Sequence, residues 1–226
     1  MTTGYRPGMP LRNGRHGYGT VTKVLHWLTF SLVLGQFLVG YSMDTEDPVA
    51  DAAADRLHDA KDQCEATADA EAAKAEEERC EEELDRQEDA LDDRADDALG
   101  SAWDDVRSGD VLGGGLSLPE THILLGLLIL AVALTRVIWR RTTPLPPWAP
   151  ALSTGERTLE SWLEKGLLLL LLVIPVTGLL LVAGEDDWVA LHVGAHVAFF
   201  VVVALHIGLV LKHTVIQRDR HLARML

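Results

Sequence analysis

This sequence lacks a basic face away from its apolar stretches, and that lack excludes nucleic-acid binding. Residues 44–110 hold 26 of the 34 acidic residues but only seven of the 20 lysines and arginines, which gives this segment a net charge of −19. The remainder of the chain carries a net charge of +5. Because binding to phosphate backbones needs a basic face, we expect no nucleic-acid partner.

A cleavage signal is lacking as well. No A-x-A-like site follows the first apolar run, which is also too long and too rich in His, Trp, Gln and Tyr for a removed signal peptide. We therefore expect residues 22–43 to be retained as a membrane span.

Long apolar runs are what the sequence does contain, and there are four of them: residues 22–43, 119–139, 163–183 and 188–212. Each reaches the roughly 20 residues that a helix needs to cross a bilayer. The sequence therefore predicts an all-α membrane four-helix bundle, the alternative being four buried helices of a soluble bundle. The chain divides into a segment with the first span (1–43), an acidic insertion (44–118), and the other three spans with the C-terminus (119–226).

The basic residues outside the acidic segment indicate how the spans are oriented. All 13 lie before the first span, around the second connection or after the fourth span, whereas the opposite connections are acidic. Because cytoplasmic loops are enriched in Lys and Arg, we expect both termini to be cytoplasmic in the bacterial inner membrane. The insertion then faces the periplasm, and His213, beside Lys212 just past the fourth span, is expected at the cytoplasmic interface.

Five of the nine histidines lie in or at the edge of the spans: His26, His122, His192, His196 and His206. Ionisable residues inside a membrane are rare and indicate function. His192 and His206 are 14 residues apart, which places them about 21 Å apart along one helix and on nearly the same face. With the orientation above, His26 lies at the depth of His206. By the same reasoning His122 lies at the depth of His192, so each leaflet holds one pair.

Paired histidines on facing helices provide the two axial nitrogens that a haem iron needs. Two haems are therefore the favoured interpretation, one held by His26 and His206 and the other by His122 and His192. Zinc or copper is the alternative for clustered histidines, but pairs about 21 Å apart cannot share one ion.

Other residues of the spans have supporting interpretations. Gly35, Gly40 and Gly126 would let a flat haem approach the backbone, although small residues also serve ordinary helix packing. His196 lies one turn from His192 but further from the common face. It is interpreted as a packing or supporting residue rather than as a ligand.

These residues resemble the bacterial cytochrome b561 family, the four-helix di-haem group that includes superoxide oxidase. The matching pieces, one in each span, are Leu25-His26-Trp27, His122 with Arg136, Pro175-Val176-Thr177-Gly178, and His192 with His206. The resemblance implies two b haems with the ligands named above. It also implies electron transfer that involves membrane quinone, with ubiquinone as the acceptor.

The third span departs from the family pattern. Family members usually carry a histidine 11 residues before the proline of the Pro-x-x-Gly motif, whereas this chain has Glu164, followed by Lys165. Glu164 and Lys165 are therefore the quinone-side candidates, with Glu164 accepting a proton or a hydrogen bond. The alternative is an interfacial carboxylate paired with Lys165 or with a loop arginine.

The long first connection is a second departure, because family members usually have a short loop there. Residues 51–99 lack Gly and Pro and are rich in helix-forming residues, although their sparse leucines leave disorder as an alternative. The only two cysteines, Cys64 and Cys80, would be about 24 Å apart on one continuous helix. A disulfide between them therefore needs a helical hairpin that turns near residues 67–74, the alternatives being an intermolecular bridge or free thiols. A C-x-x-C-H motif is absent, which excludes covalently attached haem.

Two functions are compatible with these features. The first is a superoxide-oxidase-like enzyme, in which superoxide donates an electron to the outer haem and quinone is reduced by way of the inner one. The second is a non-enzymatic electron-transfer subunit whose acidic insertion docks a basic periplasmic redox protein. Solvation or salt adaptation is the plain alternative for the acidic residues. A charge of −19 should repel superoxide unless the insertion moves aside, and this counts against the first function. Neither function determines the oligomeric state.

Overall fold

The structure is a computed structural model, and it describes residues 11–14, 17–45, 56, 59–60, 71–112, 116–148, 152–183 and 188–217. Within these ranges the chain is helical apart from loops and one isolated antiparallel bridge between Gly14 and Gly17, and it contains no strand. The all-α prediction is therefore confirmed.

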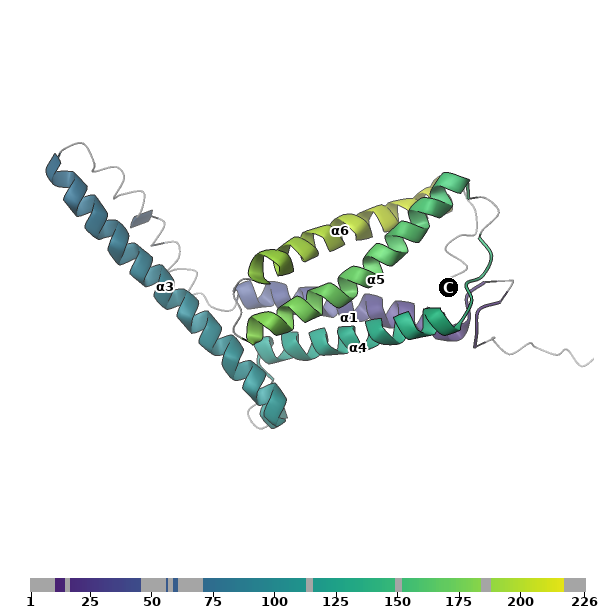
Figure 1. Cartoon of the computed structure of the whole chain (residues 1–226), viewed down its shortest axis with the longest axis horizontal. Coiled ribbons are helices and arrows are strands. Elements are labelled where there is room, and N and C mark those ends of the chain that lie inside the picture. The colour runs from purple at the N-terminus through teal and green to yellow at the C-terminus, as the bar shows by residue number, and fades with distance from the viewer. Residues whose placement is uncertain are drawn as a thin grey trace, which may run out of the picture. The chain divides into compact units, whose positions relative to one another are not determined.

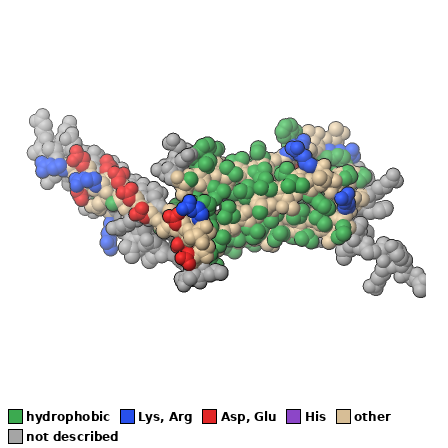
Figure 2. Space-filling view, turned by 60° about the horizontal axis from the view of Figure 1, so that its bottom comes forward, with side chains coloured by type: hydrophobic (Ala, Val, Ile, Leu, Met, Phe, Trp, Pro, Cys, Tyr) green, Lys and Arg blue, Asp and Glu red, His purple; other side chains and the backbone are tan. Residues whose placement is uncertain are grey.

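Four helices are long and apolar enough to cross a membrane: α1 (Thr20–Thr45), α4 (Leu118–Thr142), α5 (Thr154–Val182) and α6 (Val189–Leu211) (Figure 1). α6 continues into a π-helical segment, η3 (Lys212–Ile216). Large apolar side chains such as Leu38, Ile138 and Phe200 are exposed on these helices, and Figure 2 shows the face in view as mostly apolar. Lipid is the solvent that suits such a surface, so the four predicted spans are confirmed.

Capping boxes start both α4 and α5. At α4, the Ser117 N–H donates to the Glu120 carboxylate at 2.6 Å, and the Glu120 N–H donates to the Ser117 hydroxyl at 3.3 Å. At α5, the N–H and the hydroxyl of Ser153 donate to the Glu156 carboxylate at 2.8 and 2.7 Å. This cap lets α5 begin at Thr154, well ahead of the apolar run.

The chain forms two compact units, and the larger one contains most of the membrane bundle. Its described helical parts are α1 up to Gln36, α4 from Leu125, α5 up to Leu181 and the whole of α6. Buried apolar side chains come from three of these helices: Ile129, Val132, Ala133, Leu163, Leu171, Ala195, Phe199 and Leu209. α4, α5 and α6 therefore contribute to one core.

The smaller unit holds the acidic insertion and the adjoining ends of α1 and α4, from Phe37 to Leu124. Its main element is α3 (Glu71–Ser108), and a short 3-10 turn, η1 (Asp110–Leu112), follows. The helix ends at Gly109, whose φ of 82° lies in the left-handed region that glycine adopts readily. The N–H of Gly109 donates to the Asp105 carbonyl at 3.0 Å and completes this C-terminal cap.

α3 confirms the helical prediction for the second half of the insertion, and it extends beyond Gly100 to Ser108. Cys80 is disulfide-bonded, which rules out a free thiol at this position. Cys64 lies outside the described residues, as do residues 61–70, where the predicted hairpin would turn.

Candidate functional site

His26 of α1 and His206 of α6 lie close together in the larger unit. The His26 imidazole is near enough to His206, and to Arg136 of α4, to interact electrostatically with both. The His26 ring also meets Trp27 edge-on, with 5.6 Å between the ring centroids. Two imidazoles from the first and last membrane helices thus lie in the same part of the bundle.

Arg136 reaches from α4 to α1 beside this histidine pair. Its guanidinium donates to the Thr29 hydroxyl at 3.0 Å, and that hydroxyl donates in turn to the Leu25 carbonyl at 2.6 Å. Because Thr29 is buried and its hydroxyl is held by the backbone, the guanidinium has a fixed position. A fixed positive charge here can hold the carboxylate of a bound group or stabilise an added electron.

His192, near the start of α6, packs against α5. Its Nδ1 lies 2.9 Å from the Thr177 hydroxyl. A Cβ on the neighbouring Gly178 would lie only 3.1 Å from His192 Cε1, so the absence of a side chain there allows the ring to come this close. The ring of His196 meets that of His192 edge-on at 4.5 Å, and its Nδ1 donates to the His192 carbonyl at 2.9 Å. His196 is thus held by its own helix one turn away.

His122, near the start of α4, belongs to the smaller unit. A Cβ on Gly40 of α1 would lie 3.6 Å from His122 Cε1 and 3.7 Å from its Nδ1. The ring therefore lies against a glycine of a neighbouring helix, as the ring of His192 does in the larger unit. The pairing of His122 with His192 stays a prediction.

The other two glycines named from the sequence lie close to a leucine and a glutamine side chain rather than to histidine rings. A Cβ on Gly35 would be 3.9 Å from a methyl carbon of Leu125, and one on Gly126 would be 3.8 Å from Gln36 Nε2. The Oε1 atom of Gln36 is buried and has no hydrogen-bond partner among the described residues. A buried amide oxygen without a partner fits a bundle that takes up a further polar group or water.

The donor set fits haem better than it fits a bare metal ion. In the part of the chain that the structure describes, no three or more His, Cys, Asp or Glu side chains gather into a group that could hold a metal ion. Structural or catalytic zinc takes three or four protein ligands, whereas a haem iron needs only two axial ones. Glycines beside His122 and His192 let the two rings lie directly against the neighbouring helices.

Glu164 and Lys165, the quinone-side candidates, both have partners within the bundle. Glu164 forms an ion pair with Arg140 near the end of α4, and about a third of the Glu164 side chain is exposed. The Lys165 ammonium lies over the Trp162 ring, 5.5 Å from its centroid. The arrangement is that of an interfacial carboxylate paired with an arginine.

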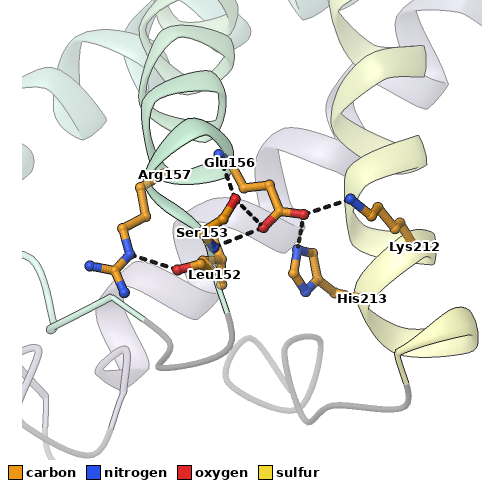
Figure 3. A network of polar contacts seen from close by, with 6 residues as sticks. All are labelled: Leu152, Ser153, Glu156, Arg157, Lys212 and His213. Carbon is orange, nitrogen blue, oxygen red and sulfur yellow. Dashed lines mark hydrogen bonds and ion pairs between the residues drawn. The ribbon is translucent and has the colours of Figure 1, made fainter.

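A second polar cluster joins the start of α5 to the end of α6 (Figure 3). Glu156 Oε1 lies 2.6 Å from Lys212 Nζ and 3.5 Å from His213 Nε2, while its other oxygen accepts from Ser153. His213 is fully buried, and its position at the cytoplasmic interface stays a prediction.

Two contacts of this site were missed by reasoning from the sequence. Thr177 and Gly178 were noted only as part of a motif, yet they are the residues of α5 that meet the His192 ring. Thr29 was not noted at all. The available signal was the Pro175–Gly178 block, because a polar residue followed by a glycine in an apolar helix marks a close polar contact.

Comparison with known protein families gives one match. The model of the family described as prokaryotic cytochrome b561 matches residues 17–226, nearly the whole chain. No curated protein and no solved structure matches the chain.

Proposed function

The chain belongs to the prokaryotic cytochrome b561 family, membrane b-type cytochromes of electron transfer, and we propose that it carries two b haems. One is held by His26 and His206, and the other by His122 and His192. The observation that carries this proposal is the proximity of His26 and His206, which come from the first and last membrane helices. Two imidazoles contributed by different helices of a bundle can serve as the axial ligand pair of a haem.

We further propose that the protein crosses the bacterial membrane with both termini in the cytoplasm and the insertion in the periplasm. The placement of all 13 basic residues outside the acidic segment supports this orientation. His206 and His26 then belong to the cytoplasmic half of the bundle, and His192 and His122 to the periplasmic half.

The chain's own residues prepare a route for electrons through the membrane. When bound, each haem supplies a one-electron Fe(III)/Fe(II) couple. His192 and His206 lie on one helix about 21 Å apart, so α6 presents one ligand in each half of the bilayer. Arg136 places its positive charge beside the cytoplasmic pair and thereby favours an additional electron there.

Membrane quinone is the proposed acceptor, and ubiquinone its chemical class. Reduction to quinol takes two electrons, delivered one at a time, and two protons from the surroundings. Glu164 is held by Arg140, so it would serve as a proton acceptor only when that ion pair opens. We therefore assign Glu164 a supporting role at the end of the bundle, with quinone proton transfer as the alternative.

Two electron donors are compatible with this circuit. Superoxide, the donor of the superoxide-oxidase-like alternative, is an anion. A basic periplasmic redox protein is favoured by the exposed carboxylates of α3, which Figure 2 shows in red: Glu82, Glu83, Asp85, Asp89, Asp93, Asp97, Asp104 and Asp105. Arg86 and Arg107 form ion pairs with two of these carboxylates, Glu83 and Asp104. The remaining negative charge favours a cationic protein surface over a small anion.

The haem assignment is tested by pyridine haemochrome and redox titration of the purified protein. We expect two non-covalent b haems per chain, and one haem fewer in each of the variants His206→Ala and His192→Ala. His196→Ala is the matched control, because this histidine lies on the same helix one turn from His192 and is not one of the four ligands in the proposal. One haem in the unmodified protein, or loss of a haem in His196→Ala, would overturn the ligand set.

A further inference from the structure

Thr177 is buried in α5 with its hydroxyl between backbone and imidazole. Only 3% of the residue is exposed. The hydroxyl oxygen lies 2.9 Å from the carbonyls of Val173 and Ile174 in its own helix, and 2.9 Å from His192 Nδ1 in α6. Water has little access to this contact, so protein atoms decide which partner donates and which accepts.

The hydrogen inventory links the direction of these bonds to the tautomer of His192. A hydroxyl has one proton, and a carbonyl oxygen can only accept. If the Thr177 proton goes to Val173 or Ile174, the hydroxyl faces His192 with a lone pair, and Nδ1 must then carry a proton to donate. The neutral imidazole has one N–H, so Nε2 is left with its lone pair.

We propose that Thr177 is a positioning residue for His192. Its hydroxyl accepts a hydrogen bond from Nδ1–H, so the unprotonated Nε2 is the ring nitrogen that would bind the haem iron. This inference rests on the proposed role of His192 as a haem ligand. Metal-bound histidines commonly donate their second N–H in this way, which fixes both the tautomer and the orientation of the ring. Thr177 itself touches neither iron nor substrate.

Gly178 supports the same orientation from the next position of α5. Its missing Cβ would lie 3.1 Å from Cε1, 3.7 Å from Nδ1 and 4.0 Å from Nε2 of His192. The ring thus lies with its Cε1 edge on the α5 backbone, while Nδ1 is bound to Thr177. The two adjacent residues fix two edges of one imidazole, and Nε2 is the ring nitrogen that remains for a ligand bond.

The hydrogen bond has a consequence for the redox equilibrium of one haem. An Nδ1–H that donates makes the imidazole a stronger electron donor through Nε2, which stabilises Fe(III) over Fe(II). Removing the acceptor should therefore raise the midpoint potential of the haem bound by His192 and leave that of the other haem in place. We expect a change of about tenfold in the Fe(III)/Fe(II) equilibrium, which is 59 mV for a one-electron couple.

The test compares Thr177→Val, which removes the hydroxyl at nearly constant volume, with Thr177→Ser, which keeps it. Redox titration resolved for the two haems, with haemochrome stoichiometry, should give two haems in both variants. The Val variant should have one midpoint potential raised by about 59 mV, and the Ser variant should have the potentials of the wild type. Thr177→Ala provides the same readout if the Val variant does not assemble.

Failure of this inference is distinguishable from failure of the ligand assignment. If His192→Ala loses a haem but Thr177→Val and Thr177→Ala keep both wild-type potentials, Thr177 is only a packing residue and the inference is overturned. If His192→Ala keeps both haems, the ligand assignment is wrong and the inference falls with it. An equal shift of both potentials also contradicts it, because Thr177 contacts only one of the four histidines named as ligands.

Discussion

Replacing Gly178 by alanine should change the haem bound by His192 while leaving the free energy of unfolding almost unaltered. The added Cβ would lie 3.1 Å from His192 Cε1, closer than ordinary van der Waals contact. The ring must therefore move away from α5 by a few tenths of an ångström. Because Thr177 lies on the same helix, this movement lengthens its 2.9 Å bond to Nδ1 towards the limit of about 3.2 Å.

The energies of this substitution oppose one another. Alanine is favoured over glycine within a helix by about 0.8–1.0 kcal/mol. A weakened hydrogen bond costs about 0.5–1.5 kcal/mol. The gain in helix propensity and the loss of hydrogen bonding nearly cancel in the free energy of unfolding. The haem potential, in contrast, depends on the position and hydrogen bonding of the imidazole and not on helix propensity. We expect an unfolding midpoint within about 2 °C of wild type, since 1 kcal/mol corresponds to about 2–4 °C at this chain length. One haem potential should rise by up to the 59 mV of a tenfold shift.

Two glycines provide matched controls. A Cβ on Gly40 would lie 3.6 Å from His122, an ordinary contact, and one on Gly194 of α6 would have no described neighbour within 4 Å. Gly40→Ala should alter the haem potentials less than Gly178→Ala, and Gly194→Ala should not alter them. Redox titration and thermal unfolding of the three variants are the measurements. Unchanged potentials in Gly178→Ala, or an equal change in Gly194→Ala, would refute the reasoning.

Three further predictions concern the charged residues. Glu164→Gln should destabilise the protein by about 1–2 kcal/mol, between the values for exposed and buried pairs, because both partners of the ion pair with Arg140 are a quarter to a third exposed. A double-mutant cycle with Arg140→Gln measures this coupling, and additive effects would contradict it. Glu156→Gln should lower the unfolding temperature, and Lys212→Gln should add little to that loss, because Lys212 acts through its contact with Glu156; additive losses in thermal unfolding would exclude this. Deleting residues 51–99 should slow haem reduction by a basic protein donor and leave reduction by superoxide unchanged or faster. Stopped-flow measurements with and without added salt decide between the donors, since screening weakens steering over about 8 Å, and slower superoxide reduction after deletion would contradict the charge argument.

The spans could be predicted because a bilayer imposes a simple length rule. Four apolar runs of sufficient length correspond to α1, α4, α5 and α6. The start of α5 could not be read from hydropathy, since Ser153 and Glu156 extend the helix by capping rather than by burial. The sequence carried that signal too, as a Ser-x-x-Glu pattern.

Contacts between helices were the part that the sequence did not determine. Periodicity places His192 and His206 on one face of α6, but the neighbour of each ring depends on how α5 is rotated and shifted against α6. Gly178 therefore became visible as a contact only at the atomic level, where its missing Cβ accounts for the position of the His192 ring.

The polar cluster between the start of α5 and the end of α6 has a consequence for how the protein is made. A short connection joins the end of α5 to the start of α6, and the ion pair between Glu156 and Lys212 joins the start of α5 to the segment that follows α6. The helix pair is therefore linked at both of its ends. Such a pair can enter the bilayer as one hairpin after synthesis, before any cofactor is available. Thr177, Gly178 and His192 all lie within it. The nascent chain would then already hold one imidazole in its final orientation when a haem is delivered.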